Sequence, residues 1–228
     1  LYCPKGRKGF PVVVFVHGGA WKWGSKELYA GLGEAFARSG VGAVICNYRL
    51  SPKVQHPAHA EDVAKVVAWT CENVGKYGGT PDNLFLCGHS AGGHLVALLA
   101  TDPTYLKAEG RSQADVKGVI AVSGVYRVAP LDVFEAAFGK DAEVCKKASP
   151  VEHVTGNHPP FLLAYAESDY PKLDDLAQEM HAALKKADSP TDLLVCKKRN
   201  HITIITGFLD PNDPLNKAFR EFVARHGK

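Results

Sequence analysis

The sequence predicts an α/β fold, with a mostly parallel central sheet and helices on both faces. Short apolar runs alternate along the chain with segments of helical periodicity, which is typical of repeated strand–helix units. The apolar runs are also continuous, as in Val12–Val16, and do not alternate with polar residues. Strands of this kind are buried on both faces, so helices must cover both sides of the sheet.

Six apolar runs are the predicted strands: residues 12–16, 41–47, 84–87, 118–123, 161–166 and 192–196. Helical patterns cover residues 25–39, 58–74, 91–100, 171–187 and 213–225. Ser25 is a candidate cap for the first helix, and Asp213-Pro214 opens the last one with a cap residue followed by a proline. In the helix over 58–74, Val67 and Trp69 are expected on the buried side.

The chain has 228 residues, a length that fits one domain. We find no internal repeat and no linker, so residues 1–228 are predicted to form a single α/β domain. Residues 124–160 are the one long stretch between predicted strands. They contain a short helical pattern near 131–138 and a proline-rich end. We expect this stretch to form a small cap over the functional site.

Composition is ordinary for a globular protein, with 46% hydrophobic residues, 22% charged residues and a net charge of +3. The basic residues are scattered in short clusters, which predicts solvated faces and no nucleic-acid partner. No apolar run approaches the ~18 residues that a membrane span needs. The sequence leaves a homodimer open.

The six cysteines are widely spaced and form no CxxC pair, which favours reduced core thiols over a disulfide framework. We therefore expect a cytoplasmic protein. Because the first residue is Leu1, a secreted mature form that has lost a signal peptide stays open.

The sharpest motif is Gly88-His89-Ser90-Ala91-Gly92, a G-x-S-x-G turn between a predicted strand and a predicted helix. This order is the one that a nucleophile elbow requires. The two glycines remove side chains that would collide in a tight turn, and the Ser90 hydroxyl then projects above the sheet. The following helix directs free N–H groups and its positive dipole end at the site. Ser90 is therefore the candidate nucleophile, with a glycine-rich turn and an incidental serine as the alternative.

A second motif, His17-Gly18-Gly19-Ala20-Trp21, directly follows the first strand. A Gly-Gly turn lets backbone N–H groups approach a ligand closely, as an oxyanion hole requires. We assign Gly19, Ala20 and Ala91 as the donors, and we expect His17 to brace the loop. Trp21 and His89 are candidate substrate contacts, although Trp21 is as well suited to core packing.

The serine needs a base, and the base needs an orienting acid. In chain order the acid and then the histidine should follow later strands. Asp169 follows the strand over 161–166, and His201 follows the last strand, so these are the candidate acid and base. Glu167 is the rival acid. Ser123 also ends a strand but lacks flanking elbow glycines, so we reject it as the nucleophile.

No metal site and no cofactor are predicted. His56 and His59 have a spacing that could suit a metal, but the sequence shows no third ligand, and a structural or solvent role is favoured.

With these motifs the chain resembles the α/β-hydrolase superfamily, and within it the esterase/lipase group. It is similar to enzymes related to hormone-sensitive lipase and to feruloyl-esterase-like carboxylesterases with the His-Gly-Gly-x-Trp motif. The matching segments run from His17–Trp21 through Asn47–Pro52, Tyr77–Gly79, the elbow and Glu167–Asp169 to Asn200-His201. The N-terminal cap of the lipase-like enzymes is missing, as are the first one or two strands, which predicts a sheet of six or seven strands.

The resemblance implies a serine carboxylesterase that acts on small or aryl acyl esters through a Ser-His-Asp triad and an acyl-enzyme. Two alternatives remain. The His-Gly-Gly-x-Trp form also occurs in kynurenine formamidases, which hydrolyse an amide by the same chemistry. The chain could also be a binding protein on this fold that has no catalytic activity.

Overall fold

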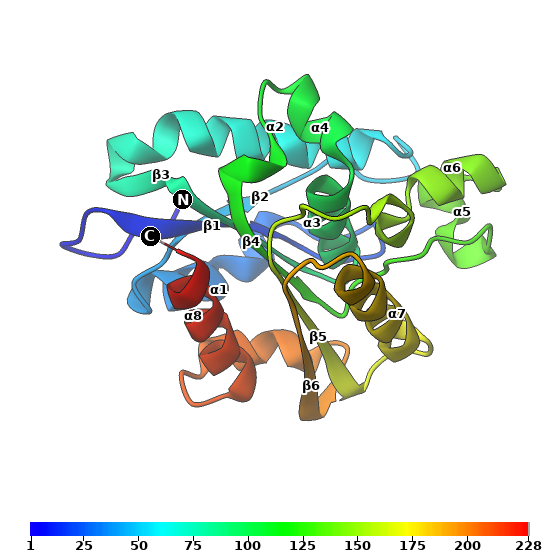
Figure 1. The fold of residues 1–228 in the computed structure, drawn as a ribbon. Helices are drawn as coiled ribbons and strands as arrows, with labels where there is room; N and C mark the ends of the chain where they lie inside the picture. The colour runs from blue at the N-terminus through cyan, green and yellow to red at the C-terminus, as the bar shows by residue number, and fades with distance from the viewer. Residues whose placement is uncertain (228) are drawn as a thin grey trace.

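A computed structural model describes residues 1–227 of the chain (Figure 1). Within these residues six parallel strands form one sheet in the order β2-β1-β3-β4-β5-β6. The predicted fold class, a parallel sheet between layers of helices, is confirmed. The strands are β1 (Phe10–Val16), β2 (Gly42–Cys46), β3 (Gly79–His89), β4 (Val116–Val122), β5 (Phe161–Ser168) and β6 (Thr191–Asn200).

The helices follow the strands in the predicted alternation, with additional short helices between them. The α-helices are α1 (Ala30–Arg38), α2 (Ala58–Asn73), α3 (Ala91–Thr101), α4 (Pro103–Ala108), α5 (Asp132–Phe138), α6 (Ala142–Lys147), α7 (Leu173–Lys186) and α8 (Pro214–His226). The 3-10 helices are η1 (Lys26–Tyr29), η2 (Val74–Tyr77), η3 (Gln113–Asp115), η4 (Pro150–His153) and η5 (Thr203–Leu209).

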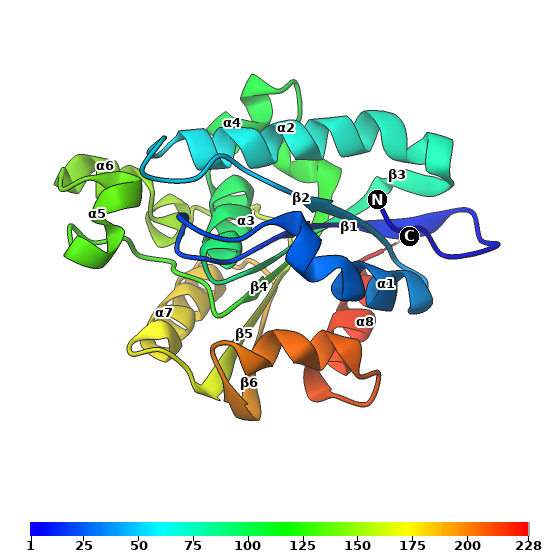
Figure 2. The same cartoon turned by 180° about the vertical axis from the view of Figure 1, so that it is seen from behind.

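The two faces of the sheet carry separate hydrophobic cores. Successive strand residues point to opposite faces, so β1 sends Val14 into one core and Phe15 into the other. One core packs against α2, α3 and α7, and the other against α1, η5 and α8. Figures 1 and 2 show α2 and α3 on one side of the sheet and α1 and α8 on the other. Burial on both faces explains the continuous apolar runs in the sequence.

Three predicted helix features are wrong in detail. The expected helix over 25–39 is divided into η1 and α1, because Tyr29 leaves helical geometry at φ −113° and ψ 17°. Ser25 makes no side-chain cap hydrogen bond. Trp69 is 43% exposed, not buried. It follows Val67 by two residues, or about 200° around an α-helix, and so points away from the buried face. The Asp213 cap is confirmed, since its side chain accepts from the Leu215 N–H.

Strand β3 begins earlier than predicted. Gly79 already pairs with Phe10, but the next pair joins Leu84 to Val12, so the register shifts between them. Residues 80–83, which read as a turn in the sequence, lie opposite the single residue Pro11 in this irregularity. The later part of β3 then runs in register between β1 and β4 up to His89.

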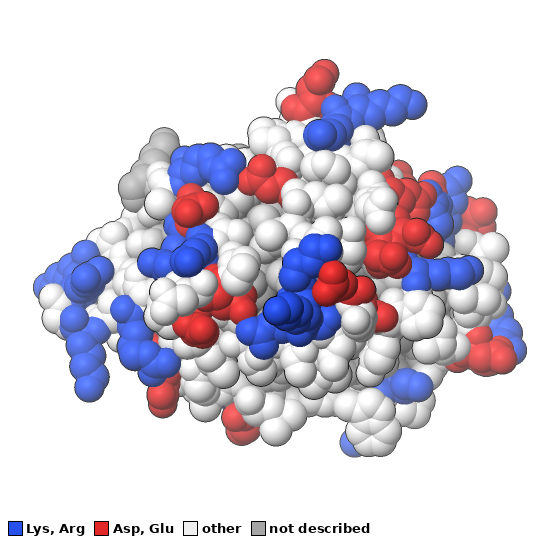
Figure 3. Space-filling view, turned by 90° about the horizontal axis from the view of Figure 1, so that it is seen from below, with Lys and Arg blue, Asp and Glu red and all other residues white. Residues whose placement is uncertain are grey.

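The surface and the thiols match an ordinary globular protein. On the face in Figure 3, Lys and Arg side chains are interspersed with Asp and Glu, and neither sign covers the face alone. Among the described residues no helix is long and apolar enough to cross a membrane. All six cysteines lie within the described residues and are free thiols, four of them buried.

Candidate active site

Ser90 occupies the sharp turn between β3 and α3. Its backbone has φ 55° and ψ −119°, a conformation that costs a residue with a side chain of order 1–3 kcal/mol. The Ser90 N–H donates to the Val122 carbonyl at 2.8 Å and anchors the turn to β4. A Cβ on Gly88 would overlap the Gly92 backbone, and a Cβ on Gly92 would overlap the backbone at the end of β1. The turn therefore needs both glycines.

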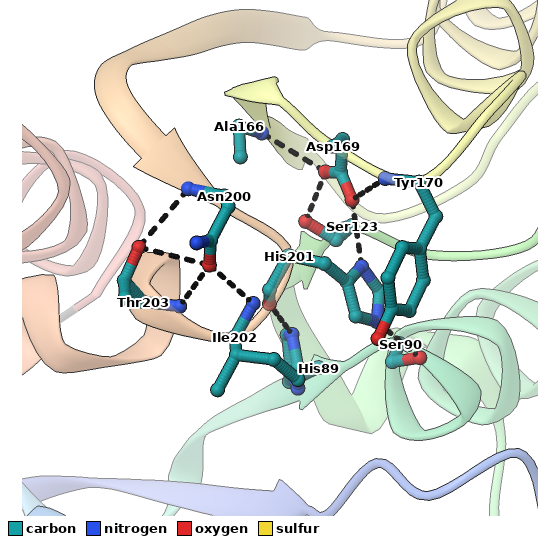
Figure 4. A network of polar contacts seen from close by, with 10 residues as sticks. All are labelled: His89, Ser90, Ser123, Ala166, Asp169, Tyr170, Asn200, His201, Ile202 and Thr203. Carbon is teal, nitrogen blue, oxygen red and sulfur yellow. Dashed lines mark hydrogen bonds and ion pairs between the residues drawn. The ribbon is translucent and has the colours of Figure 1, made fainter.

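The structure brings Ser90, His201 and Asp169 together from the turns that follow β3, β6 and β5 (Figure 4). His201 Nε2 lies 2.9 Å from Ser90 Oγ, and His201 Nδ1 lies 2.6 Å from Asp169 Oδ1. An ionised carboxylate only accepts hydrogen bonds, so His201 Nδ1 carries the proton and donates it to Asp169. Nε2 then has a free lone pair, which accepts a hydrogen bond from the Ser90 hydroxyl. An imidazole in this geometry can accept a proton from the Ser90 hydroxyl.

Asp169 is held as a carboxylate by four donors. Besides His201, it accepts from the Ser123 hydroxyl at 2.6 Å and from the backbone N–H groups of Ala166 and Tyr170 at 3.0 and 2.9 Å. Burial raises the pKa of Asp169, but these hydrogen bonds outweigh it and lower the pKa to about 2. The group is thus a buried anion with its lone pairs satisfied.

Glu167, the rival acid, lies elsewhere. Its side chain is 42% exposed and pairs with Lys197 Nζ at 3.0 Å. It also accepts from the Lys198 backbone N–H at 2.9 Å. Backbone and side-chain hydrogen bonds lower its pKa. The Glu167 carboxylate is therefore committed to a surface contact, and Asp169 is the carboxylate that contacts His201.

The loop after β1 lies directly against the Ser90 turn. A Cβ on Gly18 would sit 3.0 Å from Ser90 Cβ. Gly19, Ala20 and Trp21 all have positive φ, at 120°, 50° and 58°. Gly19 and Ala20 line the pocket in front of Ser90. Ala91 is the first residue of α3, and its N–H has no partner within the helix ladder. The three predicted oxyanion donors thus flank one turn.

His17 braces this loop, as expected. Its Nδ1 is 2.8 Å from the Gly18 carbonyl, and its ring stacks on Tyr48 with 4.5 Å between centroids. Burial lowers the pKa of His17. A neutral imidazole is compatible with donation to this carbonyl.

Trp21 and His89 both line the pocket, but each also has a second contact. Trp21 is buried, and its indole N–H donates to His94 Nδ1 at 3.2 Å. His89 Nε2 donates to the His201 backbone carbonyl at 2.8 Å. Burial lowers the pKa of His89 to about 4, so this ring is a neutral donor at neutral pH. His89 therefore ties the end of β3 to the backbone of the candidate base.

Several residues that position the site were not predicted. The Asn200 side-chain oxygen accepts from the N–H groups of Ile202 and Thr203 at 3.0 and 2.9 Å, which closes the turn that carries His201. Ser123, rejected as a nucleophile, donates to Asp169. The signal for Ser123 was its place at the end of β4, because carboxyl ends of parallel strands share one edge of a sheet. The ring of Tyr170, which also contacts His201, carried no signal.

A cavity of about 700 Å³ opens in front of Ser90. Within residues 1–227, no Asp, Glu, Lys or Arg lines it. Its wall is apolar and aromatic, formed by Trp21, Trp23, Leu28, Tyr29, Val125, Val133, Phe134, Tyr170, Pro171, Leu173 and Ile202. The site thus combines the hydrogen-bonded residues Asp169, His201 and Ser90 with an uncharged cavity wall.

Helix α5, from the 124–160 stretch, contributes Val133 and Phe134 to this wall. The helix is tied to the loop before α2, because the His56 N–H donates to the Ala137 carbonyl at 2.7 Å. Phe138 at its end packs on Trp21, with 4.8 Å between ring centroids.

The residues described provide no metal site. No group of three His, Cys, Asp or Glu side chains in residues 1–227 is placed to hold a metal ion. His59 Nε2 pairs with the Ser51 hydroxyl at 3.0 Å, and His56 Nε2 with the Tyr105 hydroxyl at 3.3 Å. Both histidines are engaged in structural contacts.

The parallel sheet, with a strained serine between β3 and α3, places the protein in the α/β-hydrolase class. Comparison with known proteins narrows the class. A sequence model of the BD-FAE family matches residues 1–184, and the chain belongs to this family. The predicted resemblance to α/β-hydrolase esterases is thereby confirmed.

The relatives include esterases and a kynurenine formamidase. Esterase LipC of Mycobacterium tuberculosis is 37% identical over 183 residues, covering 71% of this chain and 45% of LipC. Kynurenine formamidase of Danio rerio is 26% identical, covering 94% of this chain and 73% of that protein. The chain spans less than half the length of LipC.

A solved structure, a truncated carbohydrate esterase from gut microbiota, superposes with a TM-score of 0.85. The superposition covers 97% of this chain and 87% of the other, at 18% identity, and shows a shared fold.

Proposed function

We propose that this protein is a serine hydrolase of carboxylic esters, with Ser90 as nucleophile, His201 as general base and Asp169 as the orienting acid. The observation that carries the proposal is the hydrogen-bonded series from Asp169 through His201 to Ser90, which ends at an uncharged cavity. Membership of the BD-FAE family and the similarity to LipC support ester hydrolysis.

In the first half of the reaction, His201 Nε2 takes the proton from Ser90 Oγ, and Oγ attacks the ester carbonyl carbon. The C=O bond becomes a C–O⁻ bond, and the resulting oxyanion accepts hydrogen bonds from the N–H groups of Gly19, Ala20 and Ala91. Asp169 stabilises the imidazolium. The tetrahedral intermediate then collapses, His201 returns its proton to the leaving alkoxide, and an alcohol departs.

In the second half, water replaces the alcohol. His201 takes a proton from the water, whose oxygen attacks the acyl-Ser90 carbonyl. The same donors hold the second oxyanion. Collapse breaks the bond between the acyl carbon and Ser90 Oγ, and Oγ recovers its proton from His201. The products are an alcohol and a carboxylic acid.

The cavity favours small or aryl esters without charge close to the reacting group. An ion brought against an uncharged wall loses its hydration shell and finds no opposite charge in return. N-formylkynurenine carries both a carboxylate and an ammonium group, so the wall does not favour the formamidase alternative. In this proposal residues 124–160 act as a small cap that supplies Val133 and Phe134 to the acyl or alcohol pocket.

Turnover of p-nitrophenyl acetate tests the assignment of Ser90. We expect Ser90→Ala to abolish turnover and labelling by a fluorophosphonate probe while its thermal unfolding stays close to that of the wild type. Ser39→Ala is the matched control, since Ser39 only caps its own helix through the Phe36 carbonyl. Turnover by Ser90→Ala at the wild-type rate would refute the proposal.

A substrate panel tests the substrate class. It contains p-nitrophenyl esters of increasing acyl length, methyl esters of aryl acids, the same aryl esters with a carboxylate on the ring, and N-formylkynurenine. We expect the uncharged esters to have the highest kcat/KM. Higher kcat/KM for N-formylkynurenine than for every ester would instead establish the formamidase alternative. A wild-type protein that neither hydrolyses the panel nor reacts with the probe would refute the hydrolase proposal and leave the binding-protein alternative.

A further inference from the structure

An exposed aromatic ring covers the imidazole of the candidate base. The Tyr170 ring stacks on His201 with 4.2 Å between ring centroids and 23° between ring planes. The Tyr170 residue is 56% exposed, so burial of apolar surface accounts for little of the ring's position. Figure 4 shows the ring alongside the imidazole, next to Ser90.

The backbone beneath this ring is held independently of the side chain. The Tyr170 N–H donates to Asp169 Oδ1, the same oxygen that accepts from His201. The Tyr170 carbonyl accepts from the Leu173 N–H at 3.2 Å, at the start of α7. Pro171 restricts the backbone between these two contacts. A change of the Tyr170 side chain therefore removes the stacked ring and leaves the hydrogen bonds to Asp169 in place.

We propose that Tyr170 is a positioning residue for His201, an inference that rests on the proposed ester hydrolysis. The stacked ring restrains the imidazole in the plane that joins Asp169 to Ser90. It also attracts the imidazolium that forms when His201 accepts the Ser90 proton, because the face of an aromatic ring is electronegative. This attraction is stronger for the charged ring than for the neutral one, so it stabilises the transition state more than the resting state.

The other titratable groups beside the imidazole are Asp169, after β5, and His89, at the end of β3. The His89 ring lies 4.9 Å from the His201 ring between centroids. Burial lowers the pKa of His89 to about 4, so above that pH it adds no positive charge beside the imidazolium. Asp169 and the Tyr170 ring are then the two neighbours that stabilise the imidazolium in the proposed transition state.

The test compares Tyr170→Leu with Tyr170→Phe, using kcat and KM for p-nitrophenyl acetate from pH 5 to pH 9. We expect Tyr170→Leu to lower kcat about two- to fivefold, the size of an exposed cation–π interaction. The acidic limb of its pH–activity profile should move to lower pH, because the imidazolium has lost a stabilising neighbour. Tyr170→Phe keeps the ring, so it should retain the wild-type kcat and acidic limb.

Tyr170 also lines the cavity, so a control must separate positioning from substrate contact. Leu28→Ala removes another exposed apolar side chain from the cavity wall, at η1. It should change KM and leave the acidic limb where the wild type has it. A Tyr170→Leu variant that changes KM alone, or changes nothing, overturns the proposal, provided that thermal unfolding shows it folded. Failure of ester hydrolysis itself would appear separately, as turnover that survives Ser90→Ala.

Discussion

Replacing Asp169 by asparagine keeps the shape of the side chain and removes its charge. In the proposed transition state, Asp169 lies beside an imidazolium, and Oδ1 is 2.6 Å from His201 Nδ1 in the structure. For charge centres about 4 Å apart at an effective dielectric constant of ~20, the attraction is roughly 4 kcal/mol. Its loss corresponds to about a thousandfold in kcat. In the wild type the Ala166 N–H donates to Asp169 Oδ2. An asparagine NH₂ at that position is also a donor, so this hydrogen bond would be lost.

The matched control is Glu167→Gln, two residues away. Glu167 is 42% exposed and pairs with Lys197 at the surface, where ion pairs contribute little. We expect Glu167→Gln to keep kcat for p-nitrophenyl acetate within about twofold of the wild type. Circular dichroism and thermal unfolding would show that both variants are folded. The reasoning is refuted if Asp169→Asn keeps more than a tenth of the wild-type kcat, or if Glu167→Gln suffers the larger loss.

Three further predictions concern stability. Ser123→Ala removes a 2.6 Å hydrogen bond to the Asp169 carboxylate, so the free energy of unfolding in urea at pH 7 should fall by about 1.5–3 kcal/mol. The pKa of Asp169 is lowered to about 2, so this stabilisation is present above its ordinary value of 3.8 and is lost only as pH falls through 2. The difference between Ser123→Ala and wild type should therefore be equal at pH 7 and pH 5, and a difference confined to one pH would contradict it. Gly92→Ala places a Cβ against the carbonyl oxygens at the end of β1, so its thermal unfolding midpoint should fall well below that of the wild type, and an unchanged midpoint would show that the turn tolerates a side chain. Burial lowers the pKa of His59 to about 4 and that of His94 to about 3, so the unfolded chain binds more protons below pH 6.5. Stability in urea should hold above pH 6.5 and decline toward pH 4, by up to about 1.4 kcal/mol per histidine per pH unit, and a flat profile would argue against neutral buried histidines.

The sequence by itself determined the strand and helix alternation and the local chemistry of the elbow. Each strand is buried on both faces, so each leaves a continuous apolar run that can be read without knowing its neighbours. The Ser90 turn is local in part, because Gly88 is required by its contact with the Gly92 backbone inside one five-residue motif, whereas Gly92 is required by the backbone at the end of β1. Asp169 and His201 were predictable as candidates because each directly follows a strand, and parallel strands end at one edge of the sheet.

Tertiary structure alone decided which of these groups touch. Glu167 lies near the end of β5 and pairs with Lys197, whereas Asp169 directly follows the strand and contacts His201. Ser123 becomes a donor to Asp169 because β4 and β5 are neighbours in the sheet, a pairing that no local pattern records. The contact between the Tyr170 ring and His201 also depends on strand order, because the two residues lie in turns after the adjacent strands β5 and β6. Periodicity reports how each segment is buried, whereas contacts between loops depend on strand order and register, which are set by the whole chain at once.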